Sequence, residues 1–157
     1  MDATDPGTSA RAVIDRLGLE PLVPEGGWFR RTYTGAATTA IHFLVTPEGF
    51  SALHRMRSSD EIYLFHAGAP LSMLLLDPGT GRVREVLLGP DVTAGQVVHQ
   101  VVPAGTWQGS RTTGDWTLVT AVVTPGFEWT DFELADRAAL AGCDPGAAER
   151  VAALLRD

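Results

Sequence analysis

Residues 51–68 have the sequence SALHRMRSSDEIYLFHAG, which predicts two strands joined by a turn. Side chains two residues apart share a face of a strand, so His54 should lie beside Met56, and Glu61 beside Tyr63. An imidazole and a carboxylate are costly in an apolar interior unless each has a partner. If these faces line the inside of a barrel, we expect His54 and Glu61 to face one another in a pocket.

The rest of the chain shows the same alternation of short apolar runs and turn residues. Runs such as TTAIHFLVTPEG, PLSMLLLDPGTG and WTLVTAVVTPG are rich in Val, Ile, Leu and aromatic residues and end in Gly, Pro or Asp clusters. Their spacing is typical of an antiparallel sandwich or barrel. We predict one all-β domain over residues 1–157, with a short helix at 9–17, a barrel at about 28–130 and a helical tail at 132–157.

Composition excludes several classes of protein. The formal net charge of the 157 residues is -7, and the basic residues form no stripe, so we expect no nucleic-acid partner. No run of eighteen apolar residues and no signal-peptide pattern occurs, which predicts a cytoplasmic protein without a membrane partner. Cys143 is the only cysteine, so no intrachain disulfide can form, and we interpret it as an inert thiol.

Two motifs resemble those of the cupin superfamily. The first motif of that superfamily is a Gly, five residues, His-x-His, three or four residues, a Glu, six residues and a final Gly. In this chain the first His, the Glu and the final Gly are matched by His54, Glu61 and Gly68. Met56 replaces the second His of that motif. The second motif is Pro-x-Gly, two residues and His; this chain has PAG followed by Gln108 at the His position.

A narrower resemblance covers nearly the whole chain. The blocks PEGGWFRRTY, TAIHFLVTP, LGPDVTAGQ, VVPAGTWQG and VTPGFEWTDFELADRAAL are similar to the small cupin-5 family, long filed as a domain of unknown function. The resemblance implies a jelly-roll barrel, also called a double-stranded β-helix, in which an incomplete metal triad is usual. This chain departs from that family in having His42, His66 and His99, and strand alternation places His66 outside the pocket.

The leading hypothesis is an enzyme that moves a proton on a small carbonyl-containing metabolite, giving isomerisation, epimerisation, cyclisation or dehydration. It needs no cofactor. The catalytic candidates are His54, as a base set by a carboxylate, with Glu61 and Tyr63. Arg30 or Arg31 could stabilise an enolate oxygen, and alternation does not decide which of them faces inward. The substrate-binding candidates are Tyr33, Met56, Phe65, Trp107, Gln108 and Phe127.

Two alternatives stay open. In the first, His54, Glu61 and Gln108 hold iron, nickel, manganese or zinc in a dioxygenase or lyase, although a Gln oxygen is a weak ligand for such metals. In the second, the barrel binds a metabolite without turning it over. Exposed edge strands are commonly covered by a second copy of the chain, so we also expect a homodimer, with residues 32–38 as contributors.

Overall fold

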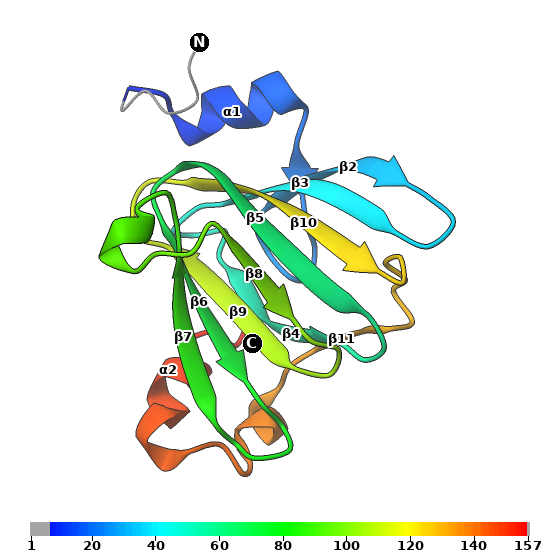
Figure 1. Cartoon of the computed structure of the whole chain (residues 1–157), viewed down its shortest axis with the longest axis vertical. Coiled ribbons are helices and arrows are strands. Elements are labelled where there is room, and N and C mark those ends of the chain that lie inside the picture. The colour runs from blue at the N-terminus through cyan, green and yellow to red at the C-terminus, as the bar shows by residue number, and fades with distance from the viewer. Residues whose placement is uncertain (1–6, 157) are drawn as a thin grey trace.

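The computed structural model describes residues 7–156 and consists mainly of two antiparallel sheets that enclose a common interior (Figure 1). The first sheet has the strand order β1-β2-β3-β10-β5-β8, and the second has the order β11-β4-β9-β6-β7. Consecutive strands therefore often lie in different sheets, as in a jelly roll. The predicted all-β jelly-roll barrel with short helices is confirmed.

The first sheet carries one wall of the interior. Its strands are β1 (Glu20–Pro21), β2 (Trp28–Thr34), β3 (Thr39–Val45), β5 (Asp60–Gly68), β8 (His99–Val102) and β10 (Thr117–Thr124). The β2–β3 hairpin contains residues 32–38 and extends beyond the body of the barrel (Figure 1). The homodimer expected to use these residues stays a prediction.

The second sheet carries the opposite wall. Its strands are β4 (Ser51–Met56), β6 (Leu71–Leu76), β7 (Val83–Leu88), β9 (Trp107–Thr112) and β11 (Phe132–Leu134). Strand β11 lies in the stretch that the sequence assigned to a helical tail. It is extended because it pairs with the edge of β4, where Phe132 lies opposite Met56 and Leu134 opposite His54.

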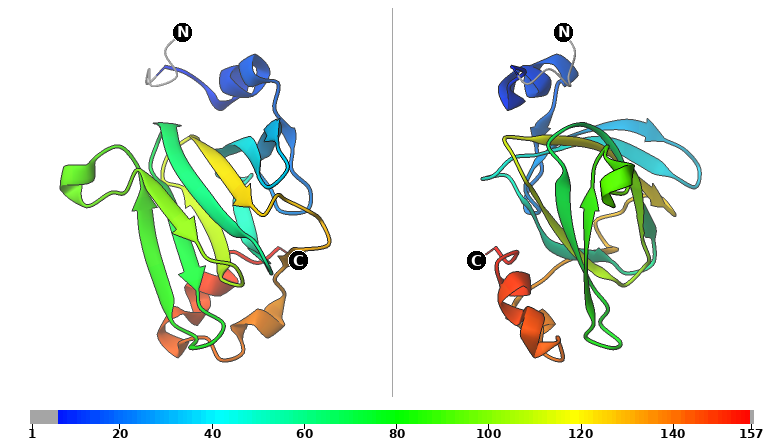
Figure 2. Two further views of the ribbon diagram at one scale, coloured as in Figure 1. Left: turned by 45° about the vertical axis from the view of Figure 1, so that its right-hand side comes forward. Right: turned by 60° about the vertical axis from the view of Figure 1, so that its left-hand side comes forward.

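Helical segments lie at the two ends of the barrel (Figure 2). Helix α1 (Ala10–Leu17) begins where the Ser9 hydroxyl accepts a hydrogen bond from the Ala12 amide. At the other end, the 3₁₀ turns η2 (Arg137–Leu140) and η3 (Pro145–Ala147) lead into α2 (Ala148–Ala152), while η1 (Val92–Ala94) precedes β8. No helix within residues 7–156 is long and apolar enough to cross a membrane.

The barrel interior is packed with apolar side chains over part of its length. Buried residues from both sheets form its core, among them Val45, Leu71, Met73, Leu88 and Val119. Two further apolar clusters lie outside the barrel, one beneath α1 and one between the second sheet and the C-terminal segment. The packed core leaves the remaining part of the interior free for a cavity.

Candidate functional site

A cavity of about 230 Å³ lies against the inner face of the first sheet. Its walls are mainly apolar and come from Leu22, Phe29, Ile41, Phe43, Ala121, Val123, Phe127 and Trp129. The polar side chains that line it are Glu25, Arg31, Thr39, Glu61 and Tyr63. An apolar cavity with a few polar groups is the usual form of a small-molecule site.

Glu61 connects the two sheets through hydrogen bonds to its carboxylate. It lies on β5 and is buried, and its Oε1 accepts a hydrogen bond from the Tyr63 hydroxyl at 3.0 Å. The same oxygen accepts a second hydrogen bond from Gln108 Nε2, on β9 of the opposite sheet, at 2.7 Å. These two donors hold the carboxylate in place and partly compensate for its burial.

His54 lies on β4 and turns one ring nitrogen toward two carboxylates. Its Nδ1 is 2.7 Å from the Ala52 carbonyl oxygen, which can only accept, so Nδ1 carries a proton. Its Nε2 lies 3.6 Å from Oε1 of Glu25 and 3.9 Å from Oε1 of Glu61. The ring stacks on Phe132 at 5.4 Å, and it is not among the residues that line the cavity. His54 therefore lies behind the carboxylates.

Glu25 is the functional candidate that the sequence analysis missed. It lies in the turn between β1 and β2, is buried, and accepts a hydrogen bond of 2.7 Å from the Ser51 hydroxyl. The following Gly26 and Gly27 have φ values of 105° and 77°, a region that L side chains rarely adopt. A Cβ at Gly27 would come within 2.6 Å of the Phe43 ring. The two glycines let this turn pass close to the barrel and direct Glu25 inward.

Burial and charge together set the protonation states of this cluster. Burial alone would lower the pKa of His54, but the charges of Glu25 and Glu61 outweigh it and raise that pKa to about 9. Burial raises the pKa of Glu25, and the charge of Glu61 raises it further, while His54 and Ser51 act in the opposite direction. Burial, followed by the two carboxylate charges, also raises the pKa of Tyr63.

These protonation states change the role predicted for His54. A histidine whose pKa is about 9 is an imidazolium at neutral pH and cannot accept a proton. Glu25 and Glu61 line the cavity, whereas His54 does not. The carboxylates are thus better placed than the imidazole to act as a base, because they meet a ligand directly.

The donor set of this cluster does not fit the metal site considered from sequence. The structure does bring His54, Glu61 and Gln108 together, but Gln108 turns its N–H group toward Glu61 instead of offering an oxygen. Nδ1 of His54 is held by the Ala52 carbonyl oxygen, so this ring could offer a metal only Nε2. Within residues 7–156, no group of three or more His, Cys, Asp or Glu side chains is arranged to hold a metal ion.

Tyr33 was predicted to bind substrate, and the structure places it elsewhere. Its side chain is 58% exposed and does not line the cavity. The pairing of β2 with β3 shifts register between Arg31 and Tyr33. This bulge breaks the alternation that would put both side chains on one face.

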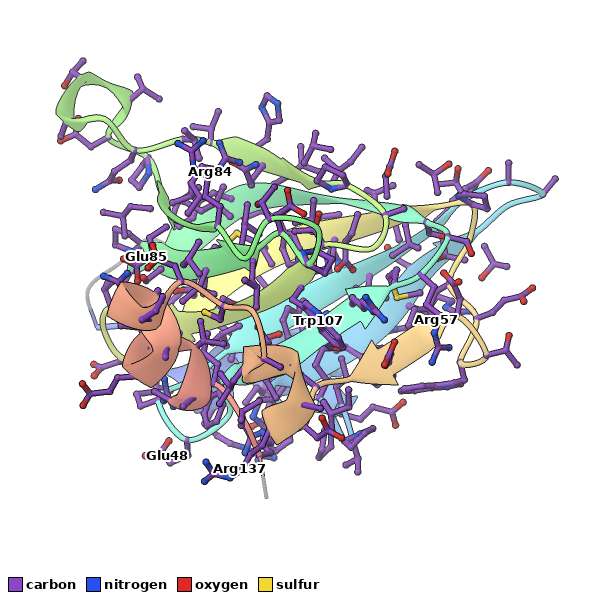
Figure 3. The ribbon with its side chains drawn as sticks, turned by 90° about the horizontal axis from the view of Figure 1, so that it is seen from below. Glu48, Arg57, Arg84, Glu85, Trp107 and Arg137 are labelled. Carbon is purple, nitrogen blue, oxygen red and sulfur yellow. The ribbon has the colours of Figure 1, made fainter. Side chains whose placement is uncertain are left out.

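Trp107 also lies outside the cavity. Its neighbour Gln108 points into the barrel, so alternation turns Trp107 to the outer face of β9. There it belongs to an apolar cluster that includes Val151 and Leu154 of the C-terminal segment, and the Arg55 guanidinium lies 4.3 Å from the centre of its ring. Figure 3 shows Trp107 near the η2 segment. Trp107 thus stabilises the attachment of the tail.

The other substrate candidates divide between core and cavity. Met56 is buried opposite Phe132, and Phe65 packs against the barrel core. Neither of these two side chains lines the cavity. Phe127 does line it, together with Trp129, which lies 4.9 Å from Phe127 in an edge-to-face arrangement. Sequence alternation could not assign Trp129, because it lies in the loop between β10 and β11.

Two further expectations concern residues on β2 and β5. Arg31 lines the cavity, whereas Arg30 donates a hydrogen bond of 3.4 Å to the Leu17 carbonyl oxygen. Arg31 is therefore the arginine available to a ligand. His66 is exposed, with its Nε2 2.6 Å from the Thr120 hydroxyl, which confirms that it lies outside the pocket.

Comparison with known proteins identifies the family. Residues 11–135 match the family described as Cupin superfamily (DUF985). A hypothetical protein from Leishmania major is 31% identical, has a TM-score of 0.85, and is aligned over 96% of this chain and 100% of its own. Protein SO0799 from Shewanella oneidensis is 34% identical, with a TM-score of 0.84 and coverage of 95% and 98%.

More distant structures share the fold. A cupin 2 conserved barrel domain protein from Rhodopseudomonas palustris is 18% identical, with a TM-score of 0.60 over 88% of this chain and 90% of its own. At that identity the likeness concerns the fold alone. A comparison with curated proteins finds no match.

Proposed function

The chain belongs to the cupin family described as DUF985, and on this premise we propose that it catalyses proton transfer at a carbon next to the carbonyl of a small molecule. The family and its fold support a small-molecule-binding cupin in general. The observation that carries the finer proposal is the pair of buried carboxylates, Glu25 and Glu61, at the wall of a mainly apolar cavity. Isomerisation is the simplest outcome of such a step when one base serves both proton transfers.

Glu25 is the proposed base. Its raised pKa makes the ionised carboxylate a stronger base than an exposed glutamate, and it faces the cavity. It removes a proton from the carbon, the C–H bond breaks, and the electron pair moves into the carbonyl to form an enolate. The Glu25 carboxylic acid then returns the proton on the same face, either to the same carbon or, where the enolate is conjugated with a C=C bond, to the far end of that system, which shifts the double bond. The step is balanced without an oxidant or a reductant.

Tyr63 is the proposed donor to the enolate oxygen. Tyr63 lines the cavity, and the raised pKa of its hydroxyl keeps that group protonated. Before a ligand binds, this hydroxyl donates its hydrogen bond to Glu61. In the proposed reaction it turns this hydrogen bond to the enolate oxygen. A donor placed before the reaction stabilises the charge that develops on the oxygen.

His54 is a positioning residue in this proposal. Two buried carboxylates close to the same point repel one another, and without a cation one of them would take up a proton. The imidazolium lies within 4 Å of both and lowers the pKa of Glu25 relative to what burial alone would give. It therefore keeps Glu25 in the ionised form that can accept a proton.

Deuterium exchange tests this chemistry without knowledge of the natural substrate. Phenylpyruvate, acetophenone and cyclohexanone would each be incubated with the protein in D₂O, and loss of the signal from protons next to the carbonyl would be followed by ¹H NMR. We expect exchange above the buffer rate with at least one probe. Glu25→Gln should return the rate to that of buffer, because the amide cannot accept the proton. Glu48→Gln, at an exposed glutamate, is the matched control and should exchange as the wild type does.

Two results would contradict the proposal. One is exchange at the buffer rate with all three probes in the wild-type protein. If the protein bound these probes without exchange, the alternative of a non-catalytic binder would take its place. The other is exchange that survives in Glu25→Gln, which would remove Glu25 as the base.

A further inference from the structure

We infer that the molecule bound in this cavity carries a single carboxylate, which pairs with Arg31 at the cavity mouth while its neutral end faces Glu25 and Glu61. This inference rests on the proposed function, because it takes the same cavity as the ligand site. Its starting point is the position of Arg31, which lines both the cavity and a second hollow of about 480 Å³. Thr39 and Phe127 also line both.

Because the two hollows share these residues they adjoin one another, and we take the second hollow as the entrance to the cavity. We call it the vestibule; residues of the β2–β3 hairpin, the β4–β5 turn and the loop after β10 line it. Arg31 is exposed and lies where the vestibule meets the cavity. A ligand that fills the cavity must therefore pass or touch Arg31.

Arg31 differs from its neighbour in having no protein partner. Within the described residues 7–156, no hydrogen bond or ion pair of its guanidinium is found, whereas Arg30 donates to the Leu17 carbonyl oxygen. A guanidinium presents donors in a fork that matches a carboxylate in two parallel hydrogen bonds. Arg31 is thus free to make this contact with a ligand.

Charge determines which way such a ligand enters. Glu25 and Glu61 repel an anionic group from the inner end of the cavity, and Arg31 attracts it at the outer end. The wall between them is apolar and fits an aliphatic or aromatic body. The ligand's carboxylate therefore stays at the mouth, and its neutral carbonyl end reaches the two glutamates.

The vestibule limits the charge that the ligand can carry. Glu128 and Asp131 also line it, and Asp131 accepts a hydrogen bond from the Ser58 amide. A polyphosphate chain extending outward from Arg31 would meet these carboxylates. A compact ligand with one carboxylate avoids them, which favours a small keto acid over a nucleotide-linked sugar.

Benzoate and benzamide form a matched pair of probes, because they share shape and differ in charge. Titrations followed by NMR would give the dissociation constant of each for the wild type, Arg31→Gln and the control Arg30→Gln. We expect the wild type to bind benzoate at least about tenfold more tightly than benzamide, as one charge-assisted pair provides. Arg31→Gln should abolish this preference, Arg31→Lys should keep part of it, and Arg30→Gln should keep all of it.

Equal binding of the two probes by the wild type, or a preference that survives in Arg31→Gln, would overturn the inference. Absence of binding of both probes at millimolar concentration would overturn it as well. This readout is independent of turnover. Carboxylate preference without deuterium exchange would contradict the proposed function alone, and exchange without carboxylate preference would contradict this inference alone.

Discussion

Oε1 of Glu25 lies 3.6 Å from Nε2 of His54. This contact joins the turn between β1 and β2 to strand β4. Both groups are buried, and Ser51 adds a hydrogen bond to the same carboxylate oxygen. Removal of one partner of a buried ion pair leaves the other uncompensated. The pair therefore links the stability of the barrel to the chemistry proposed for its cavity.

The His54 imidazolium should make the protein less stable at alkaline pH. A group whose pKa rises on folding stabilises the folded state fully below its unfolded pKa and loses that contribution as pH passes the folded value. The rise from 6.5 to about 9 corresponds to a contribution of about 3 kcal/mol, lost between those two pH values. Urea unfolding at the two limits should show this fall in the wild type.

Two variants test that assignment. His54→Gln should reduce the decrease in unfolding free energy between those two pH values, because no imidazolium remains to lose its proton. Glu25→Gln removes a charge that raises the pKa of His54, so the loss of stability in this variant should be smaller and should be complete at a lower pH. An unchanged fall in His54→Gln would assign the pH dependence to other groups.

Gly27→Ala should disrupt the turn that carries Glu25. The new methyl group would lie 2.6 Å from the Phe43 ring, at a residue with φ of 77°. Backbone strain and the clash together should cost about 3 kcal/mol of unfolding free energy and impair deuterium exchange. Gly95→Ala is the control, because φ is 88° but nothing lies within 4 Å, so only the strain of about 1–2 kcal/mol applies. Equal losses in the two variants would contradict the close approach at Gly27.

Phe127 and Trp107 should separate binding from stability. Phe127→Ala removes part of the cavity wall and should weaken benzoate binding measured by NMR titration. Trp107→Ala removes a buried side chain outside the cavity, so it should cost about 3–5 kcal/mol of stability and leave the dissociation constant unchanged. If this variant does not fold, Trp107→Phe serves the same comparison. Weaker benzoate binding by a folded Trp107 variant would contradict the assigned positions.

Chelation should leave the chemistry intact. Since Gln108 donates to Glu61 and His54 is charged, we expect EDTA to leave the deuterium exchange rate unchanged. Elemental analysis of protein purified without added metal should find metal well below stoichiometric amounts. Near-stoichiometric iron, nickel, manganese or zinc that is lost in Glu61→Ala would instead support the metal-dependent alternative.

The sequence was sufficient to predict the fold and part of the site. Alternation correctly placed Glu61 and Tyr63 on one inner face of β5, and the motif spacing placed Gln108 near them. Alternation does not give the position of Tyr33, because a bulge in the β2–β3 pairing interrupts the period of two residues. Backbone irregularities of this kind leave no clear trace in a single sequence.

Residues outside strands were harder to predict. Alternation does not apply to Glu25, which lies in a turn whose direction depends on two glycines and on contact with β3. Likewise, the role of His54 could not be predicted, because the charge of Glu25 is the largest single cause that raises its pKa.

The charge of His54 is the most direct test of the account. ¹⁵N NMR of the imidazole, recorded as a function of pH, reports the protonation of both ring nitrogens. We predict that both carry protons at neutral pH and that the ring titrates near pH 9. A ring that is neutral at neutral pH, with Nε2 unprotonated, would contradict the carboxylate-base account and return the role of base to His54.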